Sequence, residues 1–175
     1  MFVILPNILT LEQYLQLPIA LLKPDACPQC GKAGLWYHCH YTRKAARLPE
    51  NKALNPIPIY RFYCPCCQKT CSVLPECIPP RRWYMWCIQV QVLQQVILGR
   101  SINATSKAAK VSRRTCQRWF QRWTDSWLQH THALRTYWRS LGQYQTFGTF
   151  WQAALKQEPF SKAMRLCHEQ GVIVP

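Results

Sequence analysis

Two Cys-x-x-Cys pairs stand out in the first half of this 175-residue chain. Cys27 and Cys30 form the first pair, with Gly31 directly after them, and Cys64 and Cys67 form the second. Each such turn points two thiolates at one position, and four thiolates at about 2.3 Å complete the closed tetrahedral shell of a structural zinc ion. We therefore predict one structural Zn²⁺ bound by Cys27, Cys30, Cys64 and Cys67.

Other potential ligands lie near these pairs in the sequence, and they remain alternatives to the predicted four. They are His38, Cys39, His40, Cys66 and Cys71. The remaining cysteines, like Cys71, are better explained as small buried hydrophobic residues, because free cysteine is among the most buried residue types. This group comprises Cys77, Cys87, Cys116 and Cys167.

The eleven cysteines also bear on the cellular compartment. The first segment, MFVILPNILTLEQYL, lacks a positively charged start and a small-residue cleavage site, so it is a poor signal peptide. No run of eighteen apolar residues occurs. In a reducing compartment, many cysteines favour metal binding over disulfides. We expect a cytoplasmic, nucleoid-associated protein without a membrane segment.

The residue pattern predicts a mainly α-helical fold with a small β zinc ribbon, in four segments. Residues 1–24 form a lead-in, 25–80 the ribbon, 81–127 a helix-turn-helix, and 128–175 a C-terminal helical extension. Thr10 is a suitable N-cap for a short helix in the lead-in, over residues 11–17.

Within the ribbon, two β-type runs predict a hairpin over Leu35 to Tyr41 and Ile57 to Tyr63, with a basic loop at residues 43–52. Three helices are then predicted, over Trp83 to Leu98, Ile102 to Lys110, and Arg113 to about Trp127. Further packing helices are expected near three later stretches: Ala133 to Leu141, Phe150 to Gln157 and Ser161 to Gln170.

The second and third of these helices have the spacing of a helix-turn-helix, with Ser101 and Ser112 as N-caps. Lys110 stands where the turn usually has glycine, so it must adopt a positive φ or the turn must be reshaped. We predict base contacts from Arg113, Arg114 and Gln117. Phosphate contacts are predicted from Lys107, Lys110, Arg118 and Arg122. The alternative is an amphipathic helix pair that only packs.

The charge distribution favours nucleic acid as the partner. The chain has 22 Lys and Arg against seven Asp and Glu, and no acidic residue occurs between Cys77 and Thr124. Solvated helix faces usually interleave both signs, whereas a one-sign field suits a polyanion. The basic residues of this acid-free stretch are Arg81, Arg82, Arg100, Lys107, Lys110, Arg113, Arg114, Arg118 and Arg122.

Four sequence stretches together resemble the zinc-ribbon plus helix-turn-helix proteins of bacterial insertion sequences. They are CPQCG, YRFYCPCCQKT, SVLPECIPPRRWY and AAKVSRRTCQRWFQRW, and the resemblance covers roughly residues 25–125. It implies the same four cysteine ligands and a recognition helix at Arg113 to Trp123. It also implies DNA binding related to transposition, either at the ends of an element or as regulation. Cys71 replaces the family's usual aromatic residue, and Lys110 its usual glycine.

An enzyme is not expected. A metal-dependent nuclease needs about three converging carboxylates, whereas the acidic residues are scattered as Glu12, Asp25, Glu50, Glu76, Asp125, Glu158 and Glu169. His38 and His40, beside Tyr37 and Tyr41, resemble the metal-binding histidines and tyrosine of single-strand nucleases, but a packing or surface role is favoured.

Two other functions stay open: a general RNA-binding or single-strand-binding ribbon protein, and a transcriptional regulator unrelated to transposition. Helix-turn-helix proteins often dimerise to read two half-sites, so a homodimer is a candidate partner. A separately encoded transposase subunit is another. The aromatic C-terminal helices, around Trp127 and Trp151, are suitable for such contacts.

Overall fold

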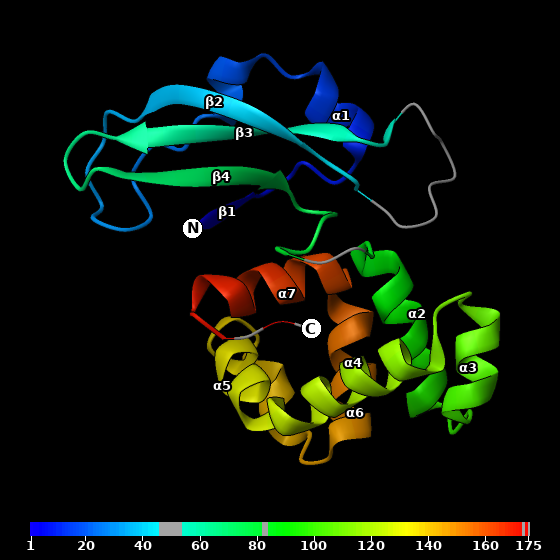
Figure 1. The fold of residues 1–175 in the computed structure, drawn as a ribbon. Helices are drawn as coiled ribbons and strands as arrows, with labels where there is room; N and C mark the ends of the chain where they lie inside the picture. The colour runs from blue at the N-terminus through cyan, green and yellow to red at the C-terminus, as the bar shows by residue number, and fades with distance from the viewer. Residues whose placement is uncertain (46–53, 82–83, 173, 175) are drawn as a thin grey trace. The chain divides into compact units, whose positions relative to one another are not determined.

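The computed structural model describes residues 1–45, 54–81, 84–172 and 174. The chain divides into two compact units, Met1–Met85 and Trp86–Pro175. Among the described residues there are seven α-helices and one four-stranded sheet, labelled in Figure 1. The prediction of a mainly helical chain with only a small ribbon is therefore corrected to a mixed α and β structure, because two further strands join the predicted hairpin.

The sheet of the first unit has the strand order β1-β4-β3-β2. The strands are β1 (Phe2–Leu5), β2 (Trp36–Arg43), β3 (Ile57–Cys64) and β4 (Lys69–Pro75). β2 and β3 pair antiparallel, as do β3 and β4, whereas β1 pairs parallel to β4. The predicted hairpin is confirmed as β2 and β3. Most of its predicted basic loop, residues 46–52, lies outside the described residues.

Sequence reasoning missed β4 and β1. The segment from Cys71 to Pro75 is buried at every position, so β4 lacks the polar alternation of a half-exposed strand. β1 is a four-residue apolar run that pairs with β4. Its Phe2 lies opposite Ser72, which is 70 residues further along the chain. Local pattern alone does not reveal such a pairing.

Helix α1 (Leu11–Gln16) begins where predicted and is followed by the short 3₁₀ helix η1 (Ile19–Leu22). Thr10 Oγ1 accepts from the Gln13 N–H at 3.2 Å, and Gln13 Oε1 accepts from the Thr10 N–H at 3.1 Å. This capping box fixes the start of the helix. Tyr14 is fully buried, and its hydroxyl donates to the Val73 carbonyl at 3.3 Å, which attaches α1 to the sheet.

The second unit is helical. Its elements are α2 (Trp86–Ile97), α3 (Ile102–Ala108), α4 (Arg113–Asp125), α5 (Trp127–Tyr137), the 3₁₀ helix η3 (Arg139–Gln143), α6 (Phe147–Gln157) and α7 (Phe160–Glu169). The predicted start of α2 at Trp83 lies outside the described residues. The helix expected near Ala133 to Leu141 is instead α5, which begins earlier at Trp127, followed by η3.

An aromatic core joins these helices. The Phe160 ring lies with its centroid 5.8 to 5.9 Å from the rings of Trp86, Trp123 and Trp151. These four side chains come from α7, α2, α4 and α6, and all are buried. The helices on either side of residue 127 therefore share one core.

None of the helices in the described part of the chain has the length and apolar character needed to cross a membrane.

Candidate metal centre and candidate nucleic-acid interface

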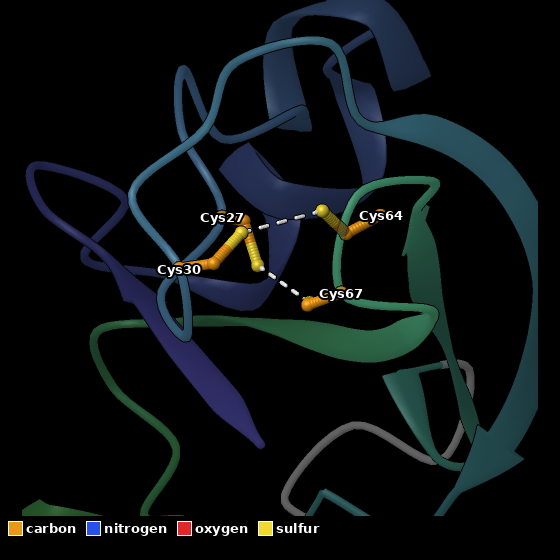
Figure 2. Close-up of side chains that lie close together, drawn as sticks. All are labelled: Cys27, Cys30, Cys64 and Cys67. Atoms are coloured by element: carbon orange, nitrogen blue, oxygen red, sulfur yellow. Dashed lines mark hydrogen bonds between the residues drawn. The ribbon is translucent and has the colours of Figure 1, made fainter.

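The four predicted ligands converge in the first unit. Cys27 and Cys30 lie in the loop before β2, Cys64 ends β3, and Cys67 lies in the turn before β4 (Figure 2). The Sγ atoms of Cys27 and Cys67 are 3.6 Å apart, those of Cys30 and Cys64 are 3.7 Å apart, and all four lie within 4.8 Å of one another. A tetrahedral shell at a Zn–S distance of about 2.3 Å requires sulfurs about 3.8 Å apart. The cluster therefore fits a metal ion, and the separations are far too long for disulfides.

Both Cys-x-x-Cys turns close on a residue with left-handed backbone. Gly31 has φ 70° and donates its N–H to the Cys27 carbonyl at 2.9 Å. Gln68 has φ 57° and donates in the same way to Cys64, also at 2.9 Å. Sequence reasoning identified Gly31 and missed Gln68, although each residue stands four positions after the first cysteine of its pair.

The thiols of the cluster influence one another's ionisation. The N–H groups of Gln29 and Cys30 lower the pKa of Cys27 to about 6. The Lys32 N–H lowers the pKa of Cys30, but burial and the neighbouring thiols outweigh it and raise that pKa to about 12. Burial also raises the pKa of Cys67. One thiolate forms readily and its neighbours resist ionisation, so a divalent cation is the natural way to stabilise several thiolates together.

The alternative ligands do not join the cluster. Among the described residues, the only group of three or more potential ligands that converge is Cys27, Cys30, Cys64 and Cys67. Cys66 is exposed, and Cys71 is buried in the core of the first unit.

The two histidines of β2 contact different tyrosines. The His38 ring lies 6.3 Å from that of Tyr63, whereas the His40 ring lies 6.1 Å from that of Tyr60. Tyr60 and Tyr63 are three residues apart on β3, so they face opposite sides of the sheet. A β-bulge in β2 between Tyr37 and Cys39 separates the two histidines in this way. They do not share a face, contrary to what simple alternation along a strand suggests.

The prediction that the remaining cysteines are buried is confirmed for Cys71, Cys77, Cys116 and Cys167. It is wrong for Cys87, which is exposed. Cys87 lies in the first turn of α2, directly after the buried Trp86, and the helical turn rotates it away from the core.

In the second unit, α3 and α4 are joined by a tight turn at Lys110. Lys110 has φ 52° and is therefore in the left-handed region, the first of the two outcomes that its position predicts. Its N–H donates to the Lys107 carbonyl at 3.3 Å, and the Val111 N–H donates to the Ser106 carbonyl at 3.0 Å. This is a Schellman motif. The same pair of bonds follows α2, where Gly99 holds the left-handed position with φ 83°.

The N-caps and inward positions of these helices follow the sequence pattern. The hydroxyl oxygens of Ser101 and Ser112 each accept from a backbone N–H three residues on, at 3.2 Å. Val111 is buried in the turn. The buried side of α4 consists of Thr115, Cys116, Trp119 and Trp123.

All seven side chains predicted to contact DNA are exposed: Lys107, Lys110, Arg113, Arg114, Gln117, Arg118 and Arg122. Those on α4 follow one another at helical spacing, opposite the buried side. Of the other cations predicted in this basic field, Arg81 and Arg100 are exposed, and Arg82 lies outside the described residues.

Few acidic groups are near this stretch of sequence. The second unit has twelve Lys and Arg but only Asp125, Glu158 and Glu169 as acidic residues. Asp125 accepts from the Gln121 amide at 2.7 Å, and the two glutamates form ion pairs with Lys162 and Arg165. The exposed cations of α3 and α4 therefore far outnumber the acidic residues of these two helices, of which Asp125 at the end of α4 is the single one.

Comparison with known proteins identifies one family. Residues 27–119 match a family model described as a domain of unknown function, DUF6431. The matched stretch includes the four clustered cysteines and ends within α4. No curated protein and no solved structure matches the chain.

Proposed function

We propose that this chain, which belongs to the DUF6431 family, is a zinc-containing protein that binds double-stranded DNA and recognises its sequence. The proposal has two parts, a structural zinc ion in the first unit and a DNA-reading helix in the second.

Zinc is proposed as the ion because four thiolates are the ligand set that zinc takes in structural sites. Two sulfur separations of 3.6 and 3.7 Å support this choice. Four protein ligands leave no open position for water or substrate, so the ion's proposed role is to hold β3, β4 and the loop before β2 together.

The observation that carries the DNA proposal is the exposed face of α4. Its four arginines and two glutamines lie exposed, and no acidic residue interrupts them before Asp125. A helix of 13 residues is about 20 Å long and fits the major groove of DNA. In this arrangement α3, the Lys110 turn and α4 act as a helix-turn-helix with α4 as the recognition helix.

Arginine and glutamine each suit a particular base. Arg113 and Arg114 can donate two hydrogen bonds to guanine O6 and N7, and Gln117 can pair with adenine N6 and N7. We assign these three residues to base contacts. The first-turn location of Arg113 and Arg114 agrees with this assignment, because helix-turn-helix proteins contact base edges with the N-terminal part of the recognition helix.

We further propose that the DNA is an end or regulatory site of an insertion sequence, on the basis of the sequence resemblance alone. Such a role admits a homodimer on two half-sites and a separately encoded transposase subunit. A regulator of ordinary transcription has the same DNA-binding surface, and the recovered target sequence distinguishes the two.

The test is selection of duplexes from a random DNA library by the full-length, zinc-loaded protein, with a single-stranded pool in parallel. We expect a short enriched duplex motif, because bidentate base contacts discriminate against a wrong base by about 1–3 kcal/mol each. A palindromic motif indicates a dimer on two half-sites.

The decisive variant is Arg113→Ala/Arg114→Ala, and Arg139→Ala/Lys156→Ala is its control. Both doubles remove two exposed positive charges, but the control residues lie in η3 and α6. We expect the first double to lose the motif and the control to retain it. If both variants select the wild-type motif equally well, the assignment of α4 as the recognition helix is wrong.

A further inference from the structure

One face of the sheet changes character along β3. Ile57, Ile59, Arg61 and Tyr63 alternate along the strand and so share a face. The two isoleucines are fully buried, in a cluster with Leu74, whereas Arg61 and Tyr63 are partly exposed. The half of this face nearest the four clustered cysteines is therefore partly open to solvent.

Aromatic rings occupy the open half. The strand register places Trp36 of β2 directly opposite Tyr63, and Trp36 is 63% exposed. The β-bulge in β2 places the exposed His38 ring 6.3 Å from the Tyr63 ring, at an interplanar angle of 33°. An exposed tryptophan beside two further rings is a candidate interaction site, because contiguous exposed apolar surface favours contact with a partner.

The open half also has a fixed positive group. Arg61 lies two residues before Tyr63 on β3 and on the same face, next to the Trp36–Tyr63 pair. Its guanidinium donates to Thr70 Oγ1 at 2.6 Å. Arg61 is the cation that β2, β3 and β4 place on the open half of this face, and these strands contain no acidic residue. The charge of this sheet surface therefore suits an anionic partner.

We propose that this aromatic patch, formed by Trp36, His38, Tyr63 and Arg61, binds single-stranded DNA by stacking on its bases. Every base has a π-face that can stack on an exposed aromatic ring, and cationic side chains pair with the phosphates between bases. In a duplex the base faces are already stacked on each other, so the patch selects unpaired strands. It is separate from the proposed duplex-reading face, which lies in the other unit.

The choice of DNA over RNA rests on the proposed function. When the protein holds a DNA duplex through its proposed duplex-reading face, a single strand that opens from that duplex is present at high effective concentration. This raises the occupancy of the aromatic patch by that strand. Stacking itself is tolerant of base sequence, so little sequence preference is expected from the patch.

The test is fluorescence anisotropy of a labelled oligo-dT of about 15 nucleotides, with the full-length, zinc-loaded protein at salt high enough to weaken phosphate contacts. Trp36→Ala and Tyr63→Ala should each weaken binding roughly 5- to 150-fold, because stacking contributes about 1–3 kcal/mol per base. Trp36→Phe retains a ring and should retain most of the affinity.

The matched control is Tyr37→Ala. Tyr37 is next to Trp36 in β2 and is 48% exposed, but it packs against Phe62 on the other face of the sheet. Its loss should leave oligo-dT binding nearly unchanged. An equal loss in Tyr37→Ala and Trp36→Ala overturns the proposal, as does tighter binding of oligo-rU than of oligo-dT. Retained zinc content and circular dichroism show that each variant is folded.

This outcome is independent of the duplex experiment. The Arg113→Ala/Arg114→Ala variant should bind oligo-dT at high salt as the wild type does, and Trp36→Ala should still select the duplex motif. If duplex selection fails while Trp36→Ala weakens oligo-dT binding, the proposed helix-turn-helix function is wrong and the stacking surface stands.

Discussion

Individual residues decide which cysteines form the metal centre. The Cys64-Pro-Cys-Cys67 turn contains three cysteines, yet only the first and last point into the cluster, while Cys66 is exposed. A two-residue spacer between ligands lets the turn fold both thiols toward one position. Adjacent residues point in different directions, so Cys66 and Cys67 do not both face the cluster.

We predict that Cys64→Ser abolishes stoichiometric zinc binding and unfolds the first unit. Without the ion, the four cysteines no longer join the loop before β2 to β3 and β4. Cys66→Ser is the matched control in the same turn and should retain one zinc per chain. Zinc content by mass spectrometry, together with circular dichroism, measures both effects. Loss of zinc from Cys66→Ser and its retention in Cys64→Ser would reverse our ligand assignment.

At the level of secondary-structure elements, the turn between α3 and α4 combines strain with an outward-facing charge. Lys110 adopts φ 52° in the position that Gly99 occupies after α2. A side chain in this region costs roughly 1 kcal/mol relative to glycine, which has no Cβ to clash. A glycine suits the backbone here, whereas a lysine places a charge beside the proposed recognition helix.

Lys110→Gly is therefore expected to raise the free energy of unfolding by up to about 1 kcal/mol while weakening binding to all duplexes. Lys107→Ala removes a similar exposed charge from within α3 without relieving backbone strain, so it should weaken binding alone. Urea denaturation measures the first effect and salt-dependent duplex affinity the second. A Lys110→Gly protein no more stable than Lys107→Ala would contradict the strain argument.

At the level of the whole molecule, the two units depend on different sources of stability. The first unit has its sheet joined by the cysteine cluster. The second unit contains six of the chain's eight tryptophans and packs Phe160 against three of them. Aromatic burial of this extent stabilises helices without a metal.

Chelation of the full-length protein should therefore unfold one unit and spare the other. Hydrogen exchange with mass spectrometry should show lost protection in β1 to β4 and retained protection in α2 to α7. Simultaneous loss of protection in both units would show that they unfold as one cooperative structure.

Local sequence signals identified much of the structure. The equal spacing of the cysteine pairs predicted which four thiols converge, because a short turn limits where its own side chains can point. Thr10, Ser101 and Ser112 predicted helix starts, since an N-cap bonds within its own first turn. The position of Lys110, where the predicted turn usually has glycine, indicated either a left-handed backbone or a reshaped turn, and the structure has the left-handed backbone.

Tertiary structure decided what depends on distant contacts. The parallel pairing of β1 with β4, the tethering of α1 by Tyr14 and the gathering of three tryptophans around Phe160 all join residues far apart in the chain. The β-bulge that separates His38 from His40 likewise arises in strand pairing. Spacing along a chain specifies turns and caps, whereas the faces of a sheet are assigned only when the strands meet. The pairing of β2 with β3 placed the exposed Trp36 opposite the partly exposed Tyr63.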